Sequence, residues 1–236
     1  MQIITSKDNE IIKNIRKLKE KKYRDSNNEY IVEGLKLIEE AIEENVNIKK
    51  IVVCEECLKD SEIEQKFLYK IAKYDCVYVS DKVFSLLTDV VNPQGMLAVI
   101  EKEGTEDKIN YAEDVIVVLD GIQDPGNLGT ILRTVDSVGL GQIILSKTSV
   151  DAYNPKVVRS TMGAIFRVKI IESENLSKDS PSQILKNISP ISFGIDSLNN
   201  MEFIIKKGTK VPNINNKLVK IKNNLDEKTV EINIYE

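Results

Sequence analysis

The chain has 236 residues, of which 42% are hydrophobic and 30% charged, and its formal net charge is −4. This composition is ordinary for a globular protein and excludes collagen-like, mucin-like and wholly disordered chains. Histidine is absent, which excludes catalytic triads, general bases and metal sites that use histidine. The chain has no run of about 18 apolar residues, and residues 1–8 lack the apolar core of a signal peptide. We therefore expect a cytoplasmic protein with no membrane partner.

The charge is distributed unevenly along the chain. Residues 1–24 carry eight basic and three acidic residues, whereas residues 101–124 carry two basic and eight acidic residues. Exposed charges are screened beyond about 8–10 Å, so a basic segment can attract phosphate even on an acidic molecule. Two interpretations of the first segment stay open: a surface that binds nucleic acid, or a solvated helix that is rich in lysine.

Three cysteines require one decision. Cys54 and Cys57 form a C-x-x-C pattern, and Cys76 is the only other cysteine. Zinc as a rule takes four ligands, so no metal site is predicted. A thiol-redox pair is an alternative function, but the two glutamates between the sulfurs disfavour the reactive thiolate. We expect incidental reduced cysteines.

In chain order, the first part alternates between helices and strands. Ile11, Ile12, Ile15 and Leu18 recur at helical spacing and predict a basic amphipathic helix over residues 7–22. The strands expected after it are 30–32, 48–53, 76–79 and 96–100, and the expected helices are 35–44, 62–73 and 81–88. Residues 101–112 are polar and show no periodicity, which predicts a linker.

The second part opens with an apolar run at 115–119, typical of a strand buried in a parallel sheet. The further expected strands are 142–145, 165–171 and 191–195, and the expected helices are 128–138, 155–162 and 181–187. This alternation predicts βαβ units, so the fold class is α/β in both parts. Residues 205–236 predict strands or loose coil, with one strand at 230–234.

The turn from Asp120 to Arg133 lies where open α/β sheets place ligands, at the end of a strand. Asn127 is expected to cap the following helix, and Gly129 in its first turn indicates close approach by another group. Arg133 lies off the apolar stripe of that helix. Two interpretations stay open: a ligand-binding turn, or a capping asparagine with a solvated arginine. The glycine spacing matches neither dinucleotide-binding nor P-loop patterns.

A second cluster begins at Asn154, which is expected to cap a helix that has Pro155 at its first position. Lys156 and Arg159 are three residues apart on that helix, so they share one face. Backbone amides at a helix start together with two cations predict a phosphate site.

The segment Asp124-Pro-Gly-Asn-Leu-Gly-Thr-Ile-Leu-Arg133 resembles motif 1 of the SpoU (TrmH-type) ribose 2′-O-methyltransferases of RNA. Residues 154–163 resemble the segment that follows it in that family. Residues 22–24, 30–34 and 92–95 resemble the family's small RNA-substrate-binding domain. The resemblance covers about residues 5–200.

The resemblance implies an α/β RNA-substrate-binding domain at 1–100, a linker at 101–112 and a methyltransferase domain at 113–204. The second domain would have a parallel sheet and a trefoil knot. The implied reaction transfers a methyl group from S-adenosylmethionine to a ribose 2′-hydroxyl of rRNA or tRNA, and the implied assembly is a homodimer.

The resemblance also implies roles for single residues. Arg133 and Asn127 match the catalytic positions. The implied RNA-binding residues are Lys22, Arg24, Lys156 and Arg159, and the implied contacts to S-adenosylmethionine are Asp196, Ser197 and Leu198.

The sequence departs from the family pattern in its C-terminal part. The family's Gly-Asn-Glu segment does not occur, and the only Ser-Leu-Asn, at 197–199, follows the strand expected at 191–195 rather than opening a last helix. Residues 205–236 are therefore expected to be a divergent or truncated segment, and affinity for S-adenosylmethionine is expected to be weak or undetectable. The alternative function is a catalytically impaired, RNA-binding relative that has lost the cofactor pocket.

Overall fold

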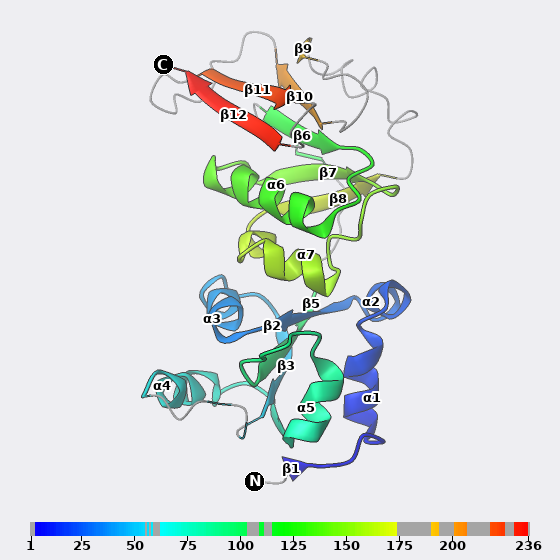
Figure 1. Ribbon diagram of the computed structural model, residues 1–236, viewed down its shortest axis with the longest axis vertical. Coiled ribbons are helices and arrows are strands. Elements are labelled where there is room, and N and C mark those ends of the chain that lie inside the picture. Colours follow the sequence, from blue (N-terminus) through cyan, green and yellow to red (C-terminus); the bar gives the residue numbers. More distant parts are fainter. Residues whose placement is uncertain are drawn as a thin grey trace. The chain divides into compact units, whose positions relative to one another are not determined.

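The computed structural model divides into two compact units (Figure 1). It describes residues 3–54, 56, 58, 62–102, 109–110, 115–173, 190–193, 201–206, 218–224 and 229–235. The first unit comprises residues 1–106, 124–133 and 150–167, and the second comprises residues 107–123, 134–149 and 168–236. The domain boundaries expected from the sequence stay a prediction.

The first unit is built on a mixed five-stranded sheet with the order β1-β4-β3-β5-β2. Its strands are β1 (Ile3–Ile4), β2 (Glu29–Glu33), β3 (Ile48–Val53), β4 (Cys76–Val79) and β5 (Met96–Glu101). Strands β1, β4 and β3 run parallel, and β5 is antiparallel to both β3 and β2. The predictions for β3 and β4 are confirmed to the residue, because apolar runs between polar turns mark both ends.

Helices cover both faces of this sheet. They are α1 (Glu10–Lys17), α2 (Lys21–Asn27), α3 (Leu35–Glu43), α4 (Glu62–Ile71) and α5 (Asp81–Leu87). Ile12 of α1 and Phe84 of α5 pack on one face, against Val52 and Leu97 (Figure 1). On the other face, α3 and α4 are joined by Lys70, whose Nζ lies 2.8 Å from a carboxylate oxygen of Glu39.

The single helix expected over 7–22 is wrong, because the chain breaks between α1 and α2. Leu18 ends the first helix, and the second begins at Lys21. The carbonyls that the break leaves without helical partners are those of Leu18 and Lys19, and Arg24 Nη1 donates to both at 2.7 Å. A buried carbonyl needs a partner, so Arg24 allows the chain to turn here.

The same guanidinium forms a buried ion pair. Arg24 Nε lies 3.0 Å from Asp151 Oδ2 and Nη2 also donates to that oxygen. The two side chains are only 2% and 9% exposed. Arg24 therefore ties the corner between α1 and α2 to the segment that begins at Asp151.

The second unit contains the sheet β8-β7-β6-β10-β9. Its strands are β6 (Val115–Leu119), β7 (Gln142–Ser146), β8 (Lys169–Ser173), β9 (Pro190–Phe193) and β10 (Met201–Lys206). Strands β6, β7 and β8 run parallel, as the α/β pattern predicts. The strand β8 begins later than expected, because the short 3₁₀ helix Ala164–Phe166 precedes it.

The C-terminal part of this sheet differs from the expectation. Strand β9 does not extend the parallel alternation, because it pairs antiparallel with β10, which in turn pairs antiparallel with β6. Two further strands, β11 (Leu218–Asn224) and β12 (Thr229–Tyr235), form an antiparallel pair, so the strand expected at 230–234 is confirmed. The helix expected at 181–187 lies outside the described residues.

Helices α6 (Pro125–Ser137) and α7 (Pro155–Ser160) approach each other at a glycine. A Cβ on Gly129 would lie 1.9 Å from Ser160 Oγ and 2.7 Å from the Ser160 carbonyl carbon. The Ser160 hydroxyl donates to the carbonyl oxygen of Pro125 at 2.9 Å. The close approach that Gly129 predicts is confirmed, and its partner is the backbone and side chain of α7.

Replacement of Arg24 tests the buried ion pair. We expect Arg24→Met to lower the free energy of unfolding by about 3–5 kcal/mol, because Asp151 and two carbonyls lose their partner. Urea denaturation measures the change, and the exposed neighbour Lys22→Met is the matched control, expected within about 0.5 kcal/mol of wild type. Equal stability of the two variants would contradict the constraint assigned to Arg24.

Replacement of Gly129 tests the helix contact. Helix propensity alone makes Gly129→Ala stabilising by about 1 kcal/mol, whereas overpacking against Ser160 costs about 1–3 kcal/mol. We expect a net loss that Ser160→Ala does not restore, because the backbone of Ser160 stays in place. Gly126→Ala in the same helix is the control. A more stable Gly129→Ala protein would show that the helices separate at little cost.

Candidate functional site

The loop that follows β6 is held by hydroxyl groups of the loop that follows β7. Gly121 N donates to Ser146 Oγ at 3.0 Å, and Ile122 N donates to Ser149 Oγ at 3.1 Å. Thr148 Oγ1 donates to Asp120 Oδ1 at 3.2 Å. These hydroxyl residues were not singled out from the sequence, although their position directly after a buried strand was an available signal. They fix the backbone at the carboxyl end of β6.

The start of α6 differs from the expected one. The helix begins at Pro125 rather than residue 128, and Asp124 is its cap: the Asp124 Oδ1 accepts a hydrogen bond from Asn127 N at 2.8 Å. The assignment of Asn127 as the cap is therefore wrong. Its side chain is exposed in the first turn of the helix and is available for contact with a ligand.

Arg133 lies on the exposed face of α6. That face is formed by the five exposed residues of the first three turns and the end of the helix: Gly126, Asn127, Thr130, Arg133 and Ser137. The buried residues Leu128, Leu132 and Val135 form the opposite stripe. The prediction that Arg133 lies off the apolar stripe is confirmed, and the helix carries Asn127 and Arg133 on one polar face.

Helix α7 begins as the sequence predicts. Asn154 Oδ1 accepts a hydrogen bond from Lys156 N at 2.9 Å, and Pro155 occupies the first turn. Lys156 is exposed. Arg159 is partly buried, with Nη1 3.8 Å from a carboxylate oxygen of Glu33, so part of its charge is already compensated inside the first unit.

Glu33 is a buried carboxylate at the end of β2. Burial raises the pKa of this carboxyl group, while a hydrogen bond from Thr88 and the charge of Arg159 act in the opposite direction. The interaction orients the guanidinium of Arg159, which makes Lys156 the more accessible of the two cations for a polyanion.

The two predicted RNA-binding residues on α2 lie in different environments. Lys22 is exposed, and its Nζ lies 5.7 Å from the centre of the Tyr23 ring. Arg24 is buried, and its guanidinium donors are occupied by Asp151 and two carbonyls. The expectation that Arg24 is presented to RNA is therefore wrong, because its side chain is 2% exposed.

The residues expected to contact S-adenosylmethionine, Asp196, Ser197 and Leu198, lie outside the described residues. Beside the described end of β6, a Cβ on Gly121 would meet no atom within 4 Å. The described backbone there leaves room for a ligand and does not enclose one. Among the described residues, no group of three or more acidic or cysteine side chains could hold a metal ion.

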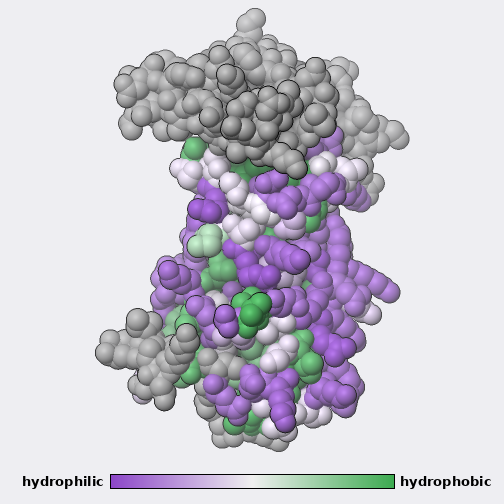
Figure 2. Space-filling view, in the orientation of Figure 1, coloured by the Kyte–Doolittle hydropathy of each residue, from purple (hydrophilic) through white to green (hydrophobic). Residues whose placement is uncertain are grey.

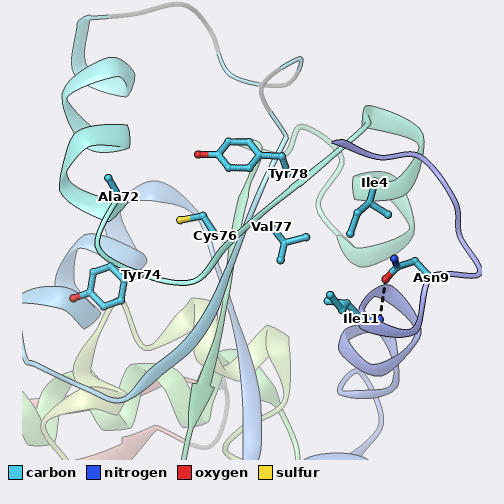
Figure 3. A pocket seen from close by; sticks show the side chains of 8 residues that line it. All are labelled: Ile4, Asn9, Ile11, Ala72, Tyr74, Cys76, Val77 and Tyr78. Atoms are coloured by element: carbon cyan, nitrogen blue, oxygen red, sulfur yellow. Dashed lines mark hydrogen bonds between the residues drawn. The ribbon is translucent and has the colours of Figure 1, made fainter. Parts of the chain in front are cut away.

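A cavity of about 580 Å³ lies elsewhere in the first unit, beside β4 (Figure 3). Figure 3 shows Tyr74, Cys76 and Tyr78 among the side chains that line it. Burial raises the pKa of the Cys76 thiol, and Asp75 acts in the same direction, so this thiol is not activated as a nucleophile. None of the residues predicted to be functional lines the cavity.

The cysteines only partly match the expectation. Cys76 is a free thiol. Cys54 is buried and disulfide-bonded, which is contrary to the reduced state expected for it. Cys57 lies outside the described residues, so the C-x-x-C pattern gains no support as a redox site.

The described surface offers mainly polar contacts. Figure 2 shows hydrophilic residues over most of the described surface on one face, with hydrophobic residues in small separate patches. None of the described helices is long and apolar enough to cross a membrane.

Comparison with known families matches two segments of the chain. Residues 9–98 match the MRM3-like substrate binding domain, and residues 114–193 match the SpoU rRNA Methylase family. The second match ends with β9, so residues 196–198 lie beyond it.

Individual relatives agree with these matches. The 23S rRNA (guanosine(2553)-2'-O)-methyltransferase RlmP of Bacillus subtilis is 34% identical over 171 residues, which are 72% of this chain and 65% of that protein. The mitochondrial rRNA methyltransferase 3 of Xenopus tropicalis is 33% identical over 66% of this chain and 38% of its own length. The chain thus spans less than two thirds of these curated relatives.

A solved structure supports the same relationship. The AdoMet-bound rRNA methyltransferase of Sinorhizobium meliloti is 34% identical, with a TM-score of 0.62 over 75% of this chain and 67% of that chain. An RNA 2'-O ribose methyltransferase of known structure is 31% identical, with a TM-score of 0.62 over 77% of this chain and 70% of its own. Since sequence, order of segments and fold agree, this chain belongs to the SpoU family of rRNA methylases.

Proposed function

We propose that the protein is an RNA 2′-O-methyltransferase that uses S-adenosylmethionine and acts on a ribose 2′-hydroxyl of structured rRNA or tRNA. The observation that carries the proposal is the exposed pair Asn127 and Arg133 on the polar face of α6, in a segment that matches the SpoU family. The named activities of the relatives, which act on rRNA, point to rRNA as the first substrate to test.

Arg133 acts on the hydroxyl by position and charge. S-adenosylmethionine supplies an electrophilic methyl group on a sulfonium sulfur. A guanidinium keeps its proton at neutral pH, so Arg133 serves as a donor that orients an RNA phosphate and stabilises negative charge developing on the 2′-oxygen. Asn127, in the first turn of the same helix, contributes an amide that helps orient the ribose.

The donor is assigned to the loop at Asp196, Ser197 and Leu198, in line with the family resemblance. The open space beside Gly121 is compatible with a ligand at the end of β6. We further propose that the protein is a homodimer located in the cytoplasm, which sedimentation and cell fractionation would test.

A second function is favoured by one observation. The match to the SpoU family ends at residue 193, and the family's Gly-Asn-Glu segment does not occur in the chain. A relative that binds RNA but has a weakened donor site would have this pattern.

Replacement of Arg133 tests the catalytic assignment. We expect Arg133→Ala to lower methyl transfer to an rRNA transcript by about 10²–10³-fold or more, because one preorganised donor is lost. Stability is expected within about 0.5 kcal/mol of wild type, since the side chain is exposed. Incorporation of radiolabelled methyl and a thermal melt measure the two effects. Ser137→Ala on the same face is the control, and retained activity with a lowered melting temperature would reverse the assignment.

Titration calorimetry with S-adenosylmethionine separates the two functions. Because the C-terminal family segments are not matched, we expect a dissociation constant weaker than about 1 mM, corresponding to less than about 4 kcal/mol of binding free energy. The rRNA transcript is added in a second titration to detect RNA binding independently. Tight binding of one donor per chain would contradict the expected loss and favour the active enzyme.

A further inference from the structure

Tyr23 lies at the corner between α1 and α2 with two ammonium groups beside its ring. Lys17 Nζ from α1 and Lys22 Nζ from α2 each lie 5.7 Å from the ring centre. Both lysines are exposed, and the tyrosine is half-buried. A ring flanked in this way presents an apolar face together with two positive charges.

Most other cations of this corner are compensated. Lys19 Nζ lies 2.8 Å from Asp89 Oδ1, and Arg24 pairs with Asp151. Lys17 and Lys22 form no ion pair with any described residue, and Lys17 contacts only the amide of Asn14, at 3.4 Å. Arg16 is exposed nearby and is likewise unpaired in the described structure. The single acid between these cations is Glu20.

The corner is held rigidly by its buried neighbour. Arg24 follows Tyr23 directly and is bonded to the carbonyls of Leu18 and Lys19. Tyr23 N lies 3.2 Å from Glu20 O, in the first turn of α2. The ring is therefore presented from a fixed backbone, which reduces the entropy lost when a flat group binds against it.

Single-stranded RNA matches this surface in both of its chemical parts. Its phosphates pair with lysine ammonium groups, and its unstacked bases stack on aromatic rings. An RNA duplex would use the lysines alone, because its bases are already stacked, and an acidic peptide would leave the ring unused. The combination of ring and unpaired cations thus favours a loop or bulge over either alternative.

We propose that Tyr23, Lys17 and Lys22 form a subsite for one unpaired nucleobase and its adjoining phosphates in single-stranded RNA. The proposal rests on the RNA-directed function above and adds the structural state of the RNA that is recognised. On binding, the base occupies the face of the Tyr23 ring, and the two ammonium groups move from the ring to the phosphates.

The absence of tryptophan from the chain makes this subsite directly observable. Tyr23→Trp introduces a single tryptophan, and its emission is expected to be quenched when a single-stranded RNA of about 12 nucleotides stacks on it. Tyr69→Trp is the matched control, because Tyr69 is 83% exposed on α4 and far along the chain. The same RNA annealed to its complement is expected to quench neither reporter.

Affinity and its salt dependence separate stacking from charge. Tyr23→Ala is expected to weaken binding of the single strand about tenfold with an unchanged salt slope, whereas Tyr23→Phe keeps wild-type affinity. The double variant Lys17→Gln, Lys22→Gln is expected to reduce the salt slope by about 2. A thermal melt confirms that each variant is folded.

Three results would overturn the subsite. They are equal quenching of the Tyr23→Trp and Tyr69→Trp reporters, equal binding of duplex and single strand, and displacement of the RNA by polyglutamate at equal charge concentration. Methyl transfer by the wild-type protein is measured on the same preparations. Methylation without specific quenching refutes the subsite alone, and specific quenching without methylation refutes the catalytic proposal alone.

Discussion

Arg24 carries a charge that is buried among groups from three places in the sequence. Its guanidinium binds the carboxylate of Asp151 and the carbonyls of Leu18 and Lys19. Ion pairs of this kind contribute little net stability compared with apolar packing, but a missing partner costs several kcal/mol. The interaction therefore acts as a constraint: conformations of the first unit that separate residues 18–19, 24 and 151 leave a charge without a partner.

That constraint extends to the segment that carries the candidate site. Asp151 also accepts a hydrogen bond from Asn154 N through its carbonyl, at 3.0 Å, and Asn154 caps α7. Six residues further on, Ser160 bonds to the carbonyl of Pro125 in the first turn of α6. Because Gly129 has no side chain, α7 can lie against that turn. The position of Asn127 thus depends on contacts that begin at the far end of the chain.

Much of the fold follows from patterns that are local. Apolar runs bounded by turns predict β3, β4 and β6, and helical spacing predicts α3 and α5, because each of these elements buries one face on a sheet. The break between α1 and α2 depends on Asp151, more than a hundred residues away, and the antiparallel strand β10 depends on its pairing with β6. Such long-range partners leave no local signal.

The candidate site was predictable to a similar degree. The exposed position of Arg133 follows from the apolar stripe of α6, which is a property of the helix alone. Asn127 was misassigned as the cap because Asp124, three residues earlier, is an equally good capping residue, and Pro125 is well suited to the first helical position. Arg24 was misassigned because a basic run suggests solvent exposure, whereas burial of one of its members depends on a distant carboxylate.

The same basic run explains how an acidic chain can present a surface for RNA. Pairing with Asp89 and Asp151 removes Lys19 and Arg24 from the free charge of the corner. The cations that remain unpaired, Lys17 and Lys22, gather at the ring of Tyr23. Exposed charges beyond about 8–10 Å are screened at physiological ionic strength, so the acidic residues near the linker contribute little to the field at Tyr23 if they lie farther away than this. What RNA encounters is set by which cations are already paired, and the net charge of the chain is a poor guide to it.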